Sequence, residues 1–190
     1  MNGELTMQNI DNTIGKSEKE ILASLKGETL DAVMITVRPS ATSRDNGKSE
    51  FSLTDVLLRT TSREVLLHLS ERESTTPDGE CLYALEITSN PIHGTTSSLS
   101  GEQDENGQEI PGWYDIRIGK TIREVQTYTD RNSCTILKDG NDIPVWDTSV
   151  IALTFDDSCL VLAKVAFMDN WRVIFQDSPH PDVGGLMNMP

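Results

Sequence analysis

Residues 150–175 read VIALTFDDSCLVLAKVAFMDNWRVIF, and this stretch decides the fold because it is the longest run rich enough in apolar residues to seed a core. Two short polar breaks divide it into three apolar segments, 150–155, 159–167 and 171–175. β-Branched and aromatic residues favour strands, and polar turn residues between such runs favour hairpins. The stretch therefore predicts three antiparallel strands connected as a meander.

The same pattern occurs earlier in the chain. Residues 56–70 (VLLRTTSREVLLHLS) align with residues 150–164 (VIALTFDDSCLVLAK) without a gap, apolar on apolar. Upstream, residues 25–33 (LKGETLDAV) match residues 117–125 (RIGKTIREV) in a Gly, a Thr, an aliphatic residue and a Val at the same spacing. Self-similarity indicates that each copy buries the same face. We interpret the chain as two copies of one β-rich unit; chance similarity between strands, which all favour Val, Leu and Thr, is the alternative.

The alignment also resolves an ambiguity in the first copy. Residues 52–69 taken alone allow a ragged helical stripe, and short apolar runs cannot be assigned from their period. The aligned partner has Asp156-Asp157-Ser158 between two β-branched runs, which favours a hairpin turn. We therefore predict a hairpin in the first copy too, with its turn at 61–64.

The predicted fold is mainly β, with two related antiparallel units packed as a sandwich or as half-barrels. The predicted boundaries are a flexible N-terminus at 1–16, a first unit at 17–93, a polar acidic linker or loop at 94–112, a second unit at 113–176 and a tail at 177–190. Ser17 and Glu20 have the spacing of a capping box, which predicts one short helix over 18–25 that ends near Gly27. Later in the second unit, a turn is expected at 130–132.

The charge of the chain excludes some classes of partner. Its 30 acidic and 16 basic residues give a net charge of −14, and its pI is about 4.5. Such a surface repels nucleic-acid phosphates and anionic membranes and steers a basic protein towards it. Aromatic residues are only 5% of the chain, which argues against stacking platforms for single-stranded nucleic acid. Plain solubility is the alternative explanation of the charge.

The cysteines and the hydropathy indicate a compartment. Cys81, Cys134 and Cys159 are odd in number and have no Cys-x-x-Cys spacing, so a disulfide framework is not expected. Cys159 aligns with Val65, which predicts a small core residue. The N-terminus lacks a signal-peptide pattern, and no run of about 18 apolar residues occurs. The sequence therefore predicts a soluble, cytoplasmic protein without a membrane partner.

No motif for catalysis, metal or cofactor binding stands out. Gly119-Lys-Thr lacks the glycine-rich turn of a phosphate loop. His68, His93 and His180 share no metal-binding spacing. His68 aligns with Leu162, which predicts a half-exposed or hydrogen-bonded histidine rather than a base. Asp139, Asn141 and Asp142 fit Asx turns better than a calcium loop. We predict no catalytic residue, no metal and no cofactor.

The leading functional hypothesis is a non-enzymatic inhibitor that blocks a basic partner protein. In size and charge the chain is similar to bacterial immunity proteins and phage-encoded inhibitors, which occupy the functional surface of a basic enzyme. One alternative is an enzyme or small-ligand-binding protein with a cleft between the two units. The other is a structural or assembly subunit that pairs through strand edges, for example as a homodimer. The candidate partner-binding residues are Glu102, Asp104, Glu105, Glu109, Trp146, Asp156 and Asp157.

Overall fold

The structure, a computed structural model, describes residues 10–36, 43–45, 48–50, 55–71, 82–91, 113–138, 141–164, 171–184 and 186. Two five-stranded sheets make up most of it, with one short helix, α1 (Lys16–Ala23). Sheet A contains β1 (Ile10–Asn12), β9 (Glu124–Lys138), β10 (Asn141–Thr154), β11 (Cys159–Lys164) and β12 (Trp171–Gln176). Sheet B contains β7 (Tyr83–Pro91), β6 (Arg63–Glu71), β5 (Asp55–Thr60), β2 (Thr29–Thr36) and β8 (Trp113–Thr121), in that spatial order. A separate small hairpin joins β3 (Ser43–Asp45) and β4 (Lys48–Glu50).

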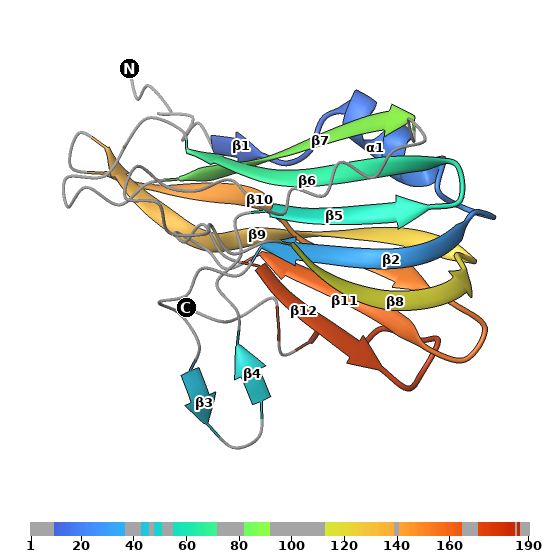
Figure 1. Cartoon of the computed structure of the whole chain (residues 1–190). Coiled ribbons are helices and arrows are strands. Elements are labelled where there is room, and N and C mark those ends of the chain that lie inside the picture. The colour runs from blue at the N-terminus through green and yellow to red at the C-terminus, as the bar shows by residue number, and fades with distance from the viewer. Residues whose placement is uncertain are drawn as a thin grey trace, which may run out of the picture.

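The two sheets lie face to face around one main core (Figure 1). Leu58 and Leu67 reach it from sheet B, and Leu153, Leu160 and Trp171 reach it from sheet A. All five side chains are at most 1% exposed. The fold is therefore mainly β with one short helix, as predicted, and its two sheets pack as a sandwich.

The apolar stretch at 150–175 forms the predicted meander. β10 pairs antiparallel with β11, and β11 pairs antiparallel with β12. Every residue of β11 is buried, because the main core covers one face and a second cluster with Val161 and Ala163 lies on the other. Burial on both faces explains why this stretch is a continuous apolar run rather than an alternating one.

Both predicted hairpins are confirmed. β5 pairs antiparallel with β6, and the chain turns at residues 61–62, inside the predicted range. The second turn lies between Thr154 and Cys159, where Phe155 N donates a hydrogen bond to Ser158 O at 2.8 Å. β5 alternates between half-buried and buried residues, so it has one core face, unlike β11.

Three predictions near the N-terminus and in β9 are wrong. The helix begins at Lys16 with Gly15 as its N-cap, and Ser17 lies inside it and bonds Glu18, so the capping box does not form. Residues 10–12, expected to be flexible, form β1, because they pair in parallel with β10 and bury Asn12. The expected turn at 130–132 is absent: β9 runs through it, and a register shift opposite Val145/Trp146 takes up the extra residues as a bulge.

The predicted linker at 94–112 does not divide the strands between the two sheets. β8, from the predicted second unit, pairs antiparallel with β2 in sheet B. β1, from the N-terminal part, pairs with β10 in sheet A. Sheet B therefore contains one strand of the predicted second unit, and sheet A contains one strand that the predicted boundaries place outside both units.

Residues 177–184, predicted as part of a tail, fold back onto sheet A. The Gln176 side chain bonds the backbone of Asp182 in both directions, at 2.8 and 3.0 Å. Val183 and Leu186 pack against the outer cluster of sheet A. Among the described residues, no helix has the length and apolar character to cross a membrane.

Candidate functional site

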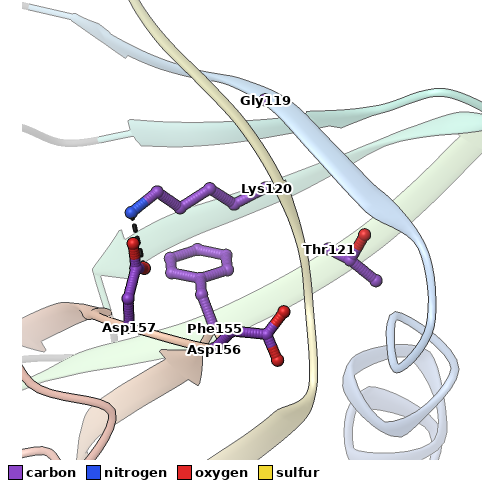
Figure 2. A pocket seen from close by; sticks show the side chains of 6 residues that line it. All are labelled: Gly119, Lys120, Thr121, Phe155, Asp156 and Asp157. Carbon is purple, nitrogen blue, oxygen red and sulfur yellow. Dashed lines mark hydrogen bonds and ion pairs between the residues drawn. The ribbon is translucent and has the colours of Figure 1, made fainter.

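A hollow of about 270 Å³ opens at the rim of the sandwich, between β8 and the turn that joins β10 to β11. Figure 2 shows Lys120 reaching across the Phe155 ring to Asp157, whereas Asp156 points to the other side. The lining residues are Gly119, Lys120, Thr121, Phe155, Asp156 and Asp157.

A second hollow of about 270 Å³ adjoins the first and shares Lys120 and Phe155 with it. Its lining is more apolar: Ile116, Arg117, Ile118, Lys120, Phe155, Ser158 and Phe175. Phe175 is 48% exposed and is the large apolar side chain most open to solvent among the described residues. We call the two hollows together the rim groove. Because β8 ends sheet B and β12 ends sheet A, the rim groove lies beside two edge strands.

The strand period explains which β8 residues face the rim groove. Ile116, Ile118 and Lys120 are two residues apart and are all half-buried, whereas Arg117 and Gly119 are exposed. Gly119 has φ +64°, a left-handed conformation that costs glycine little. The chain then turns at Ile122, whose backbone bonds Gly27 and Glu28, and enters sheet A as β9.

Two ion pairs tie the β10–β11 turn to β8 and to the segment after it. Lys120 Nζ lies 2.7 Å from Asp157 Oδ1 and donates to Ser158 Oγ at 2.7 Å. Arg123 contacts both oxygens of Asp156, at 2.7 and 2.8 Å. The Lys120 hydrogen bond lowers the pKa of Asp157, and the Arg123 hydrogen bond lowers the pKa of Asp156. Both carboxylates are therefore held ionised and already have a cationic partner.

The structure describes three of the predicted partner-binding residues, Trp146, Asp156 and Asp157, and does not bring Trp146 beside the other two. Asp156 and Asp157 line the rim groove. Trp146 is half-buried on β10, between Asp11 of β1 and Arg131 of β9 in the strand register and well before the turn. The predicted acidic residues Glu102, Asp104, Glu105 and Glu109 lie outside the described residues.

Two other predictions about single residues are confirmed. Cys159 is 1% exposed in the core, and burial raises the pKa of its thiol. His68 is half-exposed, and its Nδ1 lies 2.5 Å from Asp55 Oδ1. Among the side chains that the structure describes, no group of three or more His, Cys, Asp or Glu is placed to hold a metal ion.

Sequence reasoning missed a buried polar cluster at the junction of β1, β10 and β11. It consists of Asn12, Asp147 and Lys164, whose exposures are 2, 4 and 5%. Lys164 Nζ lies 2.8 and 2.7 Å from the two Asp147 oxygens. The one available signal was Lys164 itself, a charged residue at the end of an apolar strand. Its partners are distant in sequence, so the signal could not reveal them.

Comparison of the chain with protein-family models, with curated proteins and with solved structures finds no match. Any function assigned to this chain therefore has to be supported by the geometry of its own residues.

Proposed function

We propose that this protein is a non-enzymatic binding protein that inhibits a basic partner protein and seats an extended segment of that partner in the rim groove. The observation that carries the proposal is Phe175, 48% exposed beside Ile116, Ile118 and Phe155. Exposed aromatic side chains next to an apolar hollow are the usual anchors of protein interfaces. The net charge of −14 supports a basic partner, because it speeds the encounter with a cationic surface.

The edge strands support an extended segment as the occupant. β12 pairs with β11 on one side, and among the described residues no strand pairs with its other side. An edge strand offers backbone groups to an added strand, and side-chain pockets supply the specificity. The carboxylates of Asp156 and Asp157 are already paired, so we assign the charge attraction to the net charge and to the acidic residues at 102–109.

The proposal is tested by affinity capture from the source lysate at low and at high salt. Three proteins are compared: the wild type, Phe175→Ser, and a variant in which Glu102, Asp104, Glu105 and Glu109 are neutralised. The matched control is a variant in which four exposed acids elsewhere in the chain are neutralised, Glu20, Glu86, Glu124 and Asp177. The proposal expects a basic protein whose binding is weakened by salt, by Phe175→Ser and by the first neutralisation, but less by the control. Capture that is indifferent to salt and to Phe175→Ser would contradict it.

A small-ligand site in the same groove is the second candidate. The hollows lie between the edges of the two sheets and are lined only by residues of the predicted second unit, not by both predicted units. Each is about 270 Å³, slightly below the usual size of ligand pockets, roughly 300–1,000 Å³. Screening by NMR with apolar fragments distinguishes it: shifts confined to the rim groove at micromolar ligand would favour this candidate.

We also propose that the chain arose by duplication of one β unit. Its support is that β2, β5, β6 and β7 form an antiparallel meander in sheet B, and β9, β10, β11 and β12 form another in sheet A. Gly27 and Gly119, which occupy equivalent places in the aligned segments, both have positive φ. An assembly role through the edges of β8 and β12 is the third candidate, and light scattering at rising concentration tests it through the mass of the particle.

A further inference from the structure

An amine, a carboxamide and a carboxylate meet inside the protein. Lys164 ends β11, Asn12 ends β1, and Asp147 lies opposite Asn12 on β10. β1 and β11 pair with successive parts of β10, so the ends of these strands meet there. All three side chains are at least nine-tenths buried, so bulk water does not compete for their polar atoms.

We propose that Lys164 and Asn12 join through an intramolecular amide bond, formed by the protein itself, with Asp147 as the group that transfers the protons. A lysine amine is a nucleophile once it is neutral, and the carboxamide carbon of Asn12 is the electrophile. The product is an isopeptide bond between the end of β1 and the end of β11.

The hydrogen bonds place the two nitrogens side by side. Lys164 Nζ and Asn12 Nδ2 both donate to the backbone oxygen of Tyr83, at 2.6 and 2.8 Å. They also share Asp147 Oδ1, at 2.8 and 2.9 Å. Two atoms that share two acceptors are near neighbours, and fixed proximity of reacting groups raises the rate of a bond-forming step.

The same contacts fit the proton transfers. Asp147 Oδ1 touches both the attacking nitrogen and the leaving nitrogen, within the range required of a general acid–base group. Lys164 Nζ donates to both Asp147 oxygens, at 2.8 and 2.7 Å, so in the proposed reaction Asp147 takes one proton from the Lys164 ammonium and leaves a neutral amine beside a neutral acid. Asn12 Oδ1 is buried and has no hydrogen-bond partner in the described part of the chain, which leaves the carbonyl free to take up negative charge.

The reaction balances without a co-reactant. The Nζ–Cγ bond forms while Asp147 holds the first proton, and Nζ loses a second proton as the tetrahedral intermediate collapses. The Cγ–Nδ2 bond breaks, and the departing nitrogen takes up one proton to leave as ammonia. Ammonia carries the remaining proton away as ammonium, and Asp147 is again a carboxylate. The sum is one ammonium and one carboxamide converted into one secondary amide and one ammonium ion.

Mass spectrometry of the whole, purified protein tests the bond. The proposal expects the denatured wild type to be lighter than its sequence by one molecule of ammonia, and a proteolytic digest to contain one branched peptide that links Asn12 to Lys164. The branched peptide is decisive, because a succinimide at an Asn–Gly pair, at Asn2, Asn46 or Asn106, would also release ammonia. A folded wild type in which Lys164 and Asn12 occur only in separate linear peptides would overturn the proposal.

Single substitutions test the roles of Lys164, Asp147 and Asn12 separately. Lys164→Met and Asp147→Asn should each show the full mass of their own sequence, the first for lack of a nucleophile and the second for lack of a proton acceptor. Asn12→Asp should lose water instead of ammonia, because the leaving group changes. Lys120→Met, which removes a lysine that is also paired with an aspartate but whose side chain is 40% exposed, should keep the link. A link that persists in Asp147→Asn would contradict the assigned role of Asp147, and the wild-type digest decides the bond even if a variant does not fold.

Discussion

Two Lys–Asp pairs in this protein have the same closest N–O distance and opposite surroundings. Lys164 and Asp147 approach to 2.7 Å, with side chains 1 and 5% exposed. Lys120 and Asp157 also approach to 2.7 Å, with side chains 40 and 71% exposed. An exposed pair is screened by water and contributes little to stability, whereas a buried pair has lost its hydration and depends on its partner. The distance between the charges therefore says little about their energetic role, and burial decides it.

The largest effect is expected at the buried pair. Lys164→Met leaves Asp147 buried without the cation that it pairs with before the proposed bond forms, and we expect the free energy of unfolding in urea to fall by about 3–5 kcal/mol relative to the unlinked wild type. Loss of the proposed amide bond would add to this fall. The double variant Lys164→Met, Asp147→Leu removes both charges and should recover much of the loss relative to the single variant. A double variant no more stable than the single one would show that the unpaired charge is not the cause.

The intermediate case is Glu28, in the turn after α1. Its carboxylate accepts hydrogen bonds from Arg63, from Thr60 at 2.6 Å and from Ser62 at 2.8 Å. The Glu28 and Arg63 side chains are 18 and 25% exposed, between the values for the buried pair and for the exposed pair. We expect Glu28→Gln to lower the free energy of unfolding by about 1–2 kcal/mol, because hydrogen bonds to a charged group are stronger than neutral ones.

The pH dependence gives a second measure of the same residue. Burial alone would raise the pKa of Glu28, but the hydrogen bonds from Arg63, Thr60 and Ser62 outweigh it and lower the pKa below its ordinary value of 4.5. A lowered carboxyl pKa stabilises the folded state above the unfolded pKa, and this stability is lost as the pH falls through the folded value. Urea titrations from neutral to acid pH should show a smaller acid loss in Glu28→Gln than in the wild type. Equal acid losses would contradict the role of the Glu28 charge.

A substitution at Gly119 tests the backbone of the rim groove without changing its charges. Gly119→Ala removes no ion pair, and an added Cβ would meet no atom within 4 Å. Because φ is +64° at Gly119, we expect a loss of about 1 kcal/mol from backbone strain alone. Gly184→Ala is the matched control: its φ is outside the left-handed range and its added Cβ has an ordinary contact at 3.7 Å. Thermal unfolding of both variants measures the difference, and equal losses would remove the strain explanation.

The difference between local signals and contacts distant in sequence explains what the sequence could and could not predict. Local signals sufficed for the meander at 150–175 and for both hairpin turns, because strand period and turn residues act over a few positions. β1 escaped prediction, since one isoleucine followed by two polar residues becomes a strand only by pairing with β10, more than a hundred residues away. Asp156 and Asp157 were correctly placed in a turn, but their partners Lys120 and Arg123 come from other elements. The buried cluster needs three strands at once, and no local pattern of residues encodes that meeting.

The smallest effect is expected at the exposed pair. Lys120→Met and Asp157→Asn should each leave the free energy of unfolding unchanged within experimental error. Water already solvates both charged groups, so their attraction to each other contributes little to stability. Added salt should not change this result, since the attraction being screened is weak from the start. Urea unfolding of both variants at low and high salt, beside Lys164→Met, completes the comparison. If Lys120→Met lost as much stability as Lys164→Met, burial would not be what distinguishes the two pairs, and the rim groove would have to be regarded as a structural joint between the sheets instead of a binding surface.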